Sequence, residues 1–362
     1  MTATSAKILC VVGARPNFMK IAPIMAALRQ TPGLEARLVH TGQHYDVEMN
    51  QRFFEQLGIP NPDIDLEVGS ASHAVQTAEI MKRFEPVMDA EQPAAVLVVG
   101  DVNSTIACAL VAAKKGVRIV HVEAGLRSFD RTMPEEINRV LTDQISDLLF
   151  TTEREALTNL TREGVDPTRV QFVGNVMIDT LRSCLPRAVP PEQALAGASD
   201  PAAFLNGPNG YGILTLHRPS NVDDPVVLER LLKVLGEISA ELPLAFPVHP
   251  RTRSIIDKAG LGALLDSPHF YCLPPQGYLE MLGLMQGARL ALTDSGGVQE
   301  ETTALGIPCL TLRENTERPV TVTEGTNTIV GADPERIRQA ARDVLTSGGK
   351  AGRIPEYWDG CA

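Results

Sequence analysis

The amino-acid sequence predicts an α/β protein of two domains, each built on a parallel sheet with helices on both faces. A chain of 362 residues is long enough for two hydrophobic cores. Short runs that are apolar throughout alternate with helical patterns, which is typical of parallel strands buried on both faces. The alternation lapses once, between residues 186 and 210, where five prolines occur, and then resumes. We therefore predict a first domain at 1–185, a linker at 186–210 and a second domain at 211–362.

In the first domain, the apolar strand Lys7–Val12 runs into a glycine turn and a helix that ends near Gln30. Later strands are predicted at Ala36–His40, Ala94–Val99, Arg118–Val122, Leu148–Thr152 and Val170–Val173, and helices at Met49–Leu57, at Ala74–Met88, from a cap at Asn103-Ser104 to Lys115, and from Pro134 onward. Ligands of parallel sheets bind at the carboxyl ends of the strands. Arg15, Asp101, Glu123 and Glu135 all fall at those ends or in the loops that follow, which makes them candidate site residues.

The second domain repeats the alternation. We expect strands at Gly212–Leu216, Leu244–Pro247, Phe270–Leu273, Ala288–Thr293 and Cys309–Leu312, and helices at Val298–Leu305 and Pro334–Thr346. Two such domains in tandem predict a cleft between them, which is the usual place for a substrate.

The stretch Asp294-Ser-Gly-Gly297 predicts a phosphate site. A strand, a glycine turn and a helix start bring free backbone N–H groups and the positive end of a helix to one point. Gly296 and Gly297 allow a ligand to approach the backbone, and Ser295 can donate its hydroxyl or cap the helix. The pair Glu300-Glu301, expected in the first helical turn, would repel a diphosphate unless one of them faces a sugar hydroxyl. A capped helix after a glycine turn accounts equally well for this stretch alone.

Several other side chains could carry chemistry, and each also has a structural interpretation. Arg15 and Lys20 surround the start of the first helix and suit a diphosphate, although a lone cation is more often a solvated surface charge. Asp101 could cap the following helix, Glu135 could be an ordinary first-turn acid, and His217 could be a packed residue at a strand end. Arg218 and Arg318 are further candidate cations.

Composition and missing motifs exclude several classes of protein. The net charge of −11 argues against a nucleic-acid surface, and no apolar run is long enough for a membrane span or a signal-peptide core. The six cysteines are scattered and predict reduced packing residues of a cytoplasmic protein. The first glycine turn is not GxGxxG, and no metal-binding motif, GxSxG elbow or Walker loop occurs. We therefore expect no cofactor and no metal.

The motifs together resemble those of the non-hydrolysing UDP-N-acetylglucosamine 2-epimerase family. In order they are Gly13-Ala-Arg-Pro…Lys20, Gly100-Asp101, His121-Val-Glu-Ala-Gly-Leu-Arg127, Pro134-Glu-Glu…Asn138-Arg139, His217-Arg218, Pro247-Val-His-Pro250, Asp294-Ser-Gly-Gly-Val-Gln-Glu-Glu301 and Glu317-Arg-Pro319, over roughly residues 7 to 345. The resemblance implies a GT-B architecture of two Rossmann-like domains, a homodimer, and a UDP-sugar bound in the cleft.

The resemblance also implies roles for the candidate residues. It assigns Asp101, Glu123 and Glu135 to proton transfer at the sugar, and His217 to the leaving diphosphate. The positions that match UDP-binding residues are Arg15, Lys20, His249, Ser295, Glu301 and Arg318. Carbon 2 of such a sugar bears an unactivated proton, so without NAD the anomeric C–O bond must break first. That route needs acid and base groups on two faces of the ring and donors on the diphosphate.

Some features leave alternatives open. Gly13-Ala-Arg-Pro-Asn-Phe and Met133-Pro-Glu-Glu also occur in relatives that act on diacetamido-uronate UDP-sugars. A GT-B glycosyltransferase would share the architecture but would not require three carboxylates. A hydrolysing epimerase would release UDP and free N-acetylmannosamine, and Arg-Pro after the first glycine favours the non-hydrolysing branch. A catalytically silent nucleotide-sugar sensor would not need intact acid/base positions.

One departure from the family pattern predicts altered regulation. Many bacterial members have Gln-His-Arg where this chain has Gln43-His-Tyr45, in a region linked to binding of a second, activating substrate molecule. We expect that activating site to be weakened or absent. Saturation with UDP-N-acetylglucosamine should then be hyperbolic, and the reverse reaction should start without added UDP-N-acetylglucosamine. A sigmoidal rate curve would contradict this expectation.

Overall fold

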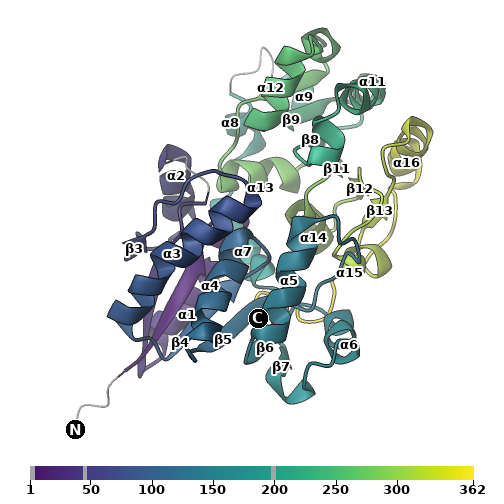
Figure 1. The fold of residues 1–362 in the computed structure, drawn as a ribbon. Helices are drawn as coiled ribbons and strands as arrows, with labels where there is room; N and C mark the ends of the chain where they lie inside the picture. Colours follow the sequence, from purple (N-terminus) through teal and green to yellow (C-terminus); the bar gives the residue numbers. More distant parts are fainter. Residues whose placement is uncertain (1–4, 44–46, 197–200) are drawn as a thin grey trace. The chain divides into compact units, whose positions relative to one another are not determined.

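The computed structural model describes residues 5–43, 47–196 and 201–362. The chain divides into two compact units: Met1–Ser183 with Glu356–Ala362, and Cys184–Pro355. Each unit contains a single parallel sheet, of seven strands in the first and six in the second. The predicted fold class, two α/β domains with parallel sheets, is therefore confirmed. Figure 1 shows the elements with their labels.

The first unit is a doubly wound sheet. In sheet order its strands are β3 (Ile64–Asp65), β2 (Leu34–His40), β1 (Ala6–Val12), β4 (Ala95–Val99), β5 (Arg118–Ala124), β6 (Leu148–Thr151) and β7 (Val170–Phe172), all paired in parallel. Its helices are α1 (Arg15–Gln30), α2 (Val47–Leu57), α3 (His73–Glu91), α4 (Asn103–Lys114), α5 (Pro134–Ile145), α6 (Arg154–Arg162) and α7 (Val176–Cys184). Helices α3, α4 and α5 lie side by side over one face of the sheet (Figure 1).

The second unit repeats this plan. Its sheet order is β10 (Phe270–Leu273), β9 (Leu244–Pro247), β8 (Gly212–Thr215), β11 (Leu290–Thr293), β12 (Cys309–Thr311) and β13 (Asn327–Ile329), again all parallel. Its helices are α8 (Pro191–Ala194), α9 (Pro201–Leu205), α10 (Pro219–Val222), α11 (Pro225–Glu241), α12 (Pro250–Lys258), α13 (Tyr278–Gln286), α14 (Gly296–Leu305), α15 (Pro319–Thr323) and α16 (Pro334–Ser347).

Both sheets contain a topological switch point, where successive strands begin to be added on the opposite side of the first strand. The switch lies between β1 and β4 in the first unit and between β8 and β11 in the second. Loops that leave two adjacent strands at such a point diverge to opposite faces, and the gap between them is where open α/β sheets bind ligands. Gly13 and Gly100 follow the two switch strands of the first sheet, and His217 and Asp294 follow those of the second.

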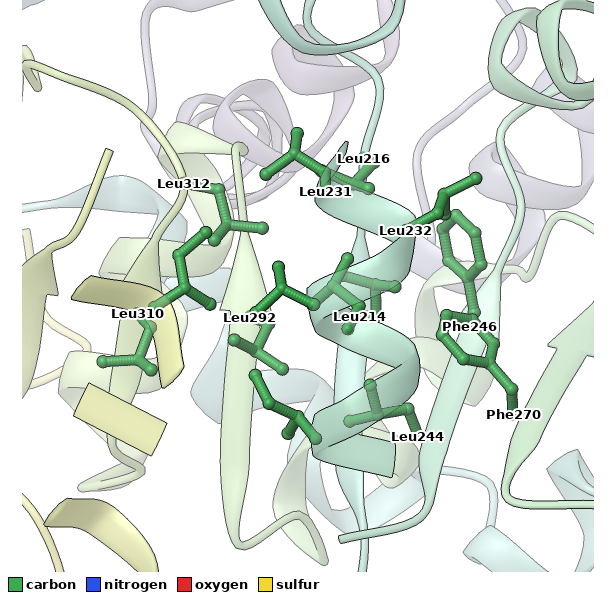
Figure 2. Packing of buried hydrophobic residues seen from close by; sticks show 14 of the residues in the cluster. Leu214, Leu216, Leu231, Leu232, Leu244, Phe246, Phe270, Leu292, Leu310 and Leu312 are labelled. Atoms are coloured by element: carbon green, nitrogen blue, oxygen red, sulfur yellow. The ribbon is translucent and has the colours of Figure 1, made fainter. Parts of the chain in front are cut away.

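Each core is formed by the apolar strands and the helices above them. In the second unit, Leu214, Leu292 and Leu310 from three adjacent strands belong to one buried cluster with Leu231 and Leu232 of α11 (Figure 2). Phe246 and Phe270, on β9 and β10, add an edge-to-face ring pair whose centroids are 5.8 Å apart. The strands that carry the site loops therefore rest on a fully packed layer.

The boundaries of the units differ from the predicted domains at two places. Residues 186–210, expected as a linker, belong to the second unit and contain α8 and α9. The last residues, Glu356–Ala362, belong to the first unit instead of the second. They are held there by Trp358, which is 1% exposed and whose indole N–H donates to the carbonyl of Thr152 at 3.1 Å.

The cysteines mostly have the packing role that the sequence predicts. All six are free; Cys10, Cys108, Cys184 and Cys309 are buried, Cys272 is half-buried and Cys361 is exposed. Burial raises the pKa of the Cys10 and Cys309 thiols to about 12, so these two are unreactive as thiolates. The exposed Cys361 does not fit the expectation of a packing residue. Among the described residues, no helix combines the length and the apolarity that a membrane span requires.

Candidate functional site

The turn after β1 is closed by Asn17 and by close packing at Gly13. A Cβ atom on Gly13 would lie only 2.0 Å from the Ser104 hydroxyl oxygen, so no side chain fits there. The Asn17 Oδ1 atom accepts the N–H groups of Gly13 and Ala14 at 3.1 Å each, and its Nδ2 donates to the carbonyl of Val99 at 3.1 Å. Asn17 therefore caps α1 and joins the two switch strands, a role that no sequence motif indicated.

The two predicted cations of this turn have different surroundings. Arg15 is half-buried at the start of α1, and its guanidinium lies 5.8 Å from the centroid of the Phe53 ring. Lys20 is buried and forms an ion pair with the Glu123 carboxylate, which is equally buried. The cation expected for the diphosphate and a carboxylate expected for proton transfer are thus partners. Both lie beside Gly100, where a Cβ atom would be 2.8 Å from the Lys20 ammonium nitrogen.

Glu123 has an unusual backbone conformation. It lies inside β5, where the pairing register with β6 shifts between Val122 and Ala124, and its φ angle is +70°. A non-glycine residue in the left-handed region costs on the order of 1–3 kcal/mol, and such residues cluster at active sites and ligand clamps. A bulge of this kind turns a side chain away from the regular alternation of a strand. The strand extends one residue beyond Glu123, so this carboxylate is part of the sheet and not of the following loop.

A buried polar network fixes the strand ends around Glu123. The His121 ring contacts the Asp143 carboxylate through Nδ1 at 2.7 Å and the Gly100 carbonyl through Nε2 at 2.8 Å. The other oxygen of Asp143 pairs with Arg127 at 2.7 Å and accepts the N–H of Gly125 at 3.1 Å. His121 and Arg127 belong to the motif that was recognised in the sequence, whereas Asp143 gave no signal there. The network joins the ends of β4 and β5 to α5.

Asp101 is held by α5 and does not cap α4. Its Oδ2 atom pairs with Arg139 at 2.5 Å, and its backbone carbonyl accepts a hydrogen bond from Asn138 at 2.9 Å. The N-cap of α4 is Val102, without a side-chain cap. The expected cap at Asn103-Ser104 is therefore wrong, because both residues lie inside the helix. Ser104 instead bonds Gln43 and Thr41, each at 2.7 Å.

Glu135 and Glu136, adjacent at the start of α5, have different environments. Glu136 is buried and accepts hydrogen bonds from the backbone N–H groups of Ser128 and Phe129, at 3.0 and 2.9 Å, and from Arg139 at 2.8 Å. It closes the loop that precedes the helix. Glu135 is half-buried in the first helical turn, as predicted.

In the second unit, Asp294 fixes His217 across the switch point. Asp294 is fully buried and accepts the backbone N–H groups of His217 and Arg218, at 3.0 and 2.9 Å, as well as the amide of Asn221 at 3.1 Å. The His217 Nδ1 atom lies 2.9 Å from its Oδ1. Burial would raise the pKa of Asp294, but His217 and these hydrogen bonds outweigh it and lower that pKa. With Nδ1 held, Nε2 is the ring atom of His217 that can reach a ligand.

The helix α14 starts at the glycines, as the phosphate interpretation requires. Its N-cap is Ser295, whose side chain makes no capping hydrogen bond, and Gly296 and Gly297 form its first turn. A Cβ atom on Gly296 would be 2.9 Å from Glu317 Oε1 and 3.3 Å from the Arg318 guanidinium carbon. A side chain at Gly296 would therefore require Glu317 and Arg318 to shift. Glu300 and Glu301 lie in the second turn, so the expectation that they occupy the first turn is corrected.

Three arginines gather around one buried glutamate next to this helix start. Glu317 lies 3.0 Å from Arg318, 2.8 Å from Arg313 and 3.6 Å from Arg218. Burial opposes ionisation of Glu317, but the three guanidinium groups hold its pKa well below the ordinary value. Arg318 also pairs with Glu300 at 3.2 Å. The cluster retains one positive charge in excess, which suits an anion at a helix N-terminus. Arg313 was not singled out in the sequence.

His249 lies close to the same group of residues. It is the N-cap of α12, where its Nδ1 accepts the N–H of Arg251 at 3.2 Å, and its ring centroid is 5.8 Å from that of His217. The second unit therefore brings together His217, Arg218, His249, Gly296 and Arg318, all of which were predicted from sequence. The first unit brings together Lys20, Asp101 and Glu123, with Glu135 on the helix that holds Asp101. Tyr45 lies outside the described residues.

Comparison with known proteins identifies a family of enzymes named for a UDP-sugar, which is consistent with an arginine-lined helix start in the second unit. The family model described as UDP-N-acetylglucosamine 2-epimerase matches residues 26–362. The chain belongs to this family.

Relatives in the family extend over nearly the whole chain. The UDP-2,3-diacetamido-2,3-dideoxy-D-glucuronate 2-epimerase of Pseudomonas aeruginosa is 43% identical over 97% of this chain and 99% of its own length. The UDP-N-acetylglucosamine 2-epimerase of Methanococcus maripaludis is 42% identical over 94% of this chain and 92% of its own. The family thus includes enzymes named for two different sugars.

Solved structures support the same assignment. The UDP-GlcNAc 2-epimerase of Methanocaldococcus jannaschii, in complex with UDP-GlcNAc and UDP, is 40% identical, with a TM-score of 0.88 over 98% of this chain and 97% of that one. A glycosyltransferase of kitacinnamycin, 12% identical with a TM-score of 0.55, shares the fold alone, over 95% of this chain and 91% of that one. The GT-B type of fold, implied by the sequence motifs, is therefore confirmed for this member of the epimerase family.

Proposed function

We propose that the protein interconverts UDP-N-acetylglucosamine and UDP-N-acetylmannosamine by the non-hydrolysing route. One observation carries the proposal. Each sheet carries a chemically distinct set of residues at the carboxyl ends of its strands: the carboxylates Asp101 and Glu123 in the first unit, and His217 with an arginine-lined helix start in the second. The first set suits proton transfer at a sugar ring, and the second suits a diphosphate. The family membership and the relatives' names support the same substrate class.

The proposed reaction is an elimination followed by a re-addition. The anomeric C–O bond breaks and its electron pair leaves with UDP. The developing oxocarbenium charge acidifies the carbon-2 proton, a carboxylate removes it, and 2-acetamidoglucal remains. A protonated group on the opposite face then delivers a proton to carbon 2 as UDP adds back to carbon 1. The residues proposed for proton transfer are Asp101, Glu123 and Glu135.

The second unit would bind the nucleotide. His217, oriented by Asp294, donates to the leaving diphosphate, and Arg218, Arg318 and the N-terminus of α14 stabilise its charge. Glu301 accepts the ribose hydroxyls. Arg15, Lys20, His249, Ser295, Gly296 and Gly297 are proposed to complete the UDP-sugar site.

Product analysis by NMR tests this function. Incubation with UDP-N-acetylglucosamine should give UDP-N-acetylmannosamine up to an equilibrium mixture. Free N-acetylmannosamine with UDP would indicate a hydrolysing enzyme, and an unchanged substrate would exclude the proposal. The 43% identity to the Pseudomonas aeruginosa enzyme favours a second candidate, a UDP-diacetamido-uronate. A parallel incubation with that sugar decides between the two substrates.

Loss of the Arg318 guanidinium should weaken UDP binding. A hydrogen bond to a charged group contributes roughly 1.5–3 kcal/mol, so Arg318→Ala should raise the Kd of UDP about tenfold or more, as measured by calorimetry. Arg338→Ala is a matched control, because Arg338 lies on α16 and pairs with Glu237 at the surface. Equal affinities in the two variants would remove Arg318 from the site.

Three further properties are proposed from the family resemblance. We propose a homodimer, a cytoplasmic location and a role in polysaccharide biosynthesis. Light scattering on the purified chain should give twice its mass of 39.1 kDa. A mass equal to that of one chain would contradict the dimer.

A further inference from the structure

A hydrogen bond between two buried side chains, Tyr278 and Glu301, is not used by the mechanism above. Tyr278 is the first residue of α13 and Glu301 lies in the second turn of α14. Both are 4% exposed, and the Tyr278 hydroxyl donates to Glu301 Oε1 at 2.9 Å. A phenol that bonds a carboxylate in this way fixes the plane of the carboxylate and occupies one of its oxygens.

The neighbouring glutamate is held by a different partner. Glu300 pairs with Arg318 at 3.2 Å, and that guanidinium also pairs with Glu317, whereas Glu301 is bonded by the Tyr278 hydroxyl. Two adjacent carboxylates thus have separate, buried partners on separate elements. Tyr278 therefore orients the Glu301 carboxylate through a contact that is not part of the arginine cluster.

We propose that Tyr278 is a positioning residue that presents Glu301 Oε2 to the vicinal hydroxyls of a nucleotide ribose. The proposal rests on the proposed function, because it deepens the role given there to Glu301. Tyr278 itself is not expected to touch the ligand. By holding Oε1, it leaves Oε2 as the acceptor and selects a ribonucleotide over a nucleotide without these hydroxyls.

The charges around Glu301 make the arrangement sensitive to pH. Burial raises the pKa of Glu301 to about 7, with Glu300 adding to the effect and Tyr278 opposing it. The other ionisable groups on this side are Arg318, which pairs with Glu300, and Cys184, whose charge would act on Tyr278. Ribose hydroxyls donate best to the ionised carboxylate. The selectivity for ribose should therefore be lost as pH falls through the pKa of Glu301, and be fully present above it.

The test compares UDP with 2′,3′-dideoxy-UDP, whose diphosphate titrates in the same way. The ratio of their dissociation constants isolates the ribose contact, and calorimetry measures it across the pKa of about 7 of Glu301. In the wild-type protein, the ratio should rise with pH to about tenfold or more in favour of UDP. Tyr278→Phe removes only the hydroxyl, and loss of its hydrogen bond raises the pKa of Glu301. In this variant the ratio of dissociation constants should therefore reach its maximum at a higher pH than in the wild-type protein.

Tyr211→Phe is the matched control. Tyr211 is also buried in the second unit, and its hydroxyl donates to the carbonyl of Leu284 at 2.6 Å. The Tyr211→Phe variant should show the same ratio of dissociation constants as the wild-type protein at every pH. A Tyr278→Phe curve identical to that of Tyr211→Phe would overturn the proposal, and so would an equal loss of affinity for both nucleotides at every pH, which is the result of a purely structural role.

These outcomes are separable from failure of the proposed function. The NMR assay of the wild-type protein reports epimerisation whatever the ribose contact does. A protein that epimerises but shows no dependence of the ratio on Tyr278 refutes this inference alone. The pH dependence of the wild-type ratio is a second measurement that needs no variant, and a flat ratio near one would overturn the proposal as well.

Discussion

Replacement of Glu123 by glutamine should lower turnover by on the order of 10²–10⁴, the span expected for loss of a general acid or base. The glutamine amide has nearly the same volume as the carboxylate, but it cannot remove the proton from carbon 2 of the sugar. UDP affinity should fall far less than turnover, because His217, Arg218 and Arg318, which are proposed to bind the diphosphate, lie in the second unit. Steady-state rates from the NMR assay, with UDP titrations by calorimetry, measure the two effects separately.

The Lys20 ion pair makes a control for folding necessary. Glu123→Gln leaves the buried Lys20 ammonium without its carboxylate, which destabilises a protein in its own right. Glu91→Gln also removes the carboxylate partner of a lysine, Lys7, at 2.8 Å in the same unit, but in a half-buried pair away from the strand ends that carry the site. That variant should retain full turnover. Unfolding temperatures of both variants show whether any loss of rate at Glu123 comes from loss of structure.

Solvent isotope incorporation provides the independent check on this role. In heavy water, the wild-type product should carry deuterium at carbon 2, because the abstracted proton exchanges with solvent or is replaced from another group. Slow re-addition should also release some free UDP and glycal. An active enzyme whose product contains no deuterium, or a Glu123→Gln variant with full turnover, would refute the assignment of Glu123.

Replacement of Trp358 by alanine should reduce the free energy of unfolding of the first unit by about 3–5 kcal/mol, the usual cost of removing a buried large aromatic side chain. The side chain is 1% exposed, and its loss also leaves the carbonyl of Thr152 without a donor. For a unit of this size, the unfolding temperature should fall by roughly 6–20 °C. Calorimetry is the appropriate measurement, since Trp358 is the sole tryptophan and its fluorescence disappears in the variant.

A neighbouring surface residue provides the comparison for Trp358. Glu356 pairs with Arg154 at 2.6 Å, but both side chains are largely exposed, at 44% and 70%. Such a pair contributes about 0–1 kcal/mol, so Glu356→Ala should scarcely change the unfolding temperature. If Trp358→Ala unfolds at the same temperature as Glu356→Ala, the last residues do not stabilise the first unit.

The sequence by itself determined the fold class and most of the elements. Leu244–Pro247 and Phe270–Leu273 are strands at the predicted bounds, and α1 ends at Gln30 as expected. These predictions succeed because hydrophobic period and glycine or proline punctuation are local properties of the chain. The same locality explains the errors, such as the cap expected at Asn103-Ser104. A polar pair before an apolar helix predicts a cap in the sequence, even where its side chains form hydrogen bonds with distant residues in the folded chain.

For the candidate site, the sequence identified residues at strand ends, and the tertiary structure decided how they pair. Glu135 and Glu136, or Glu300 and Glu301, are equivalent in a linear pattern. They differ because Ser128 bonds Glu136 and Arg318 pairs with Glu300, and both partners come from segments that pack beside these glutamates only in the folded chain. His217 and Asp294 are 77 residues apart, and they meet because β8 and β11 are neighbours in the sheet. Strand order is set by packing of whole units, so the sequence pattern could name these residues but could not assign their partners.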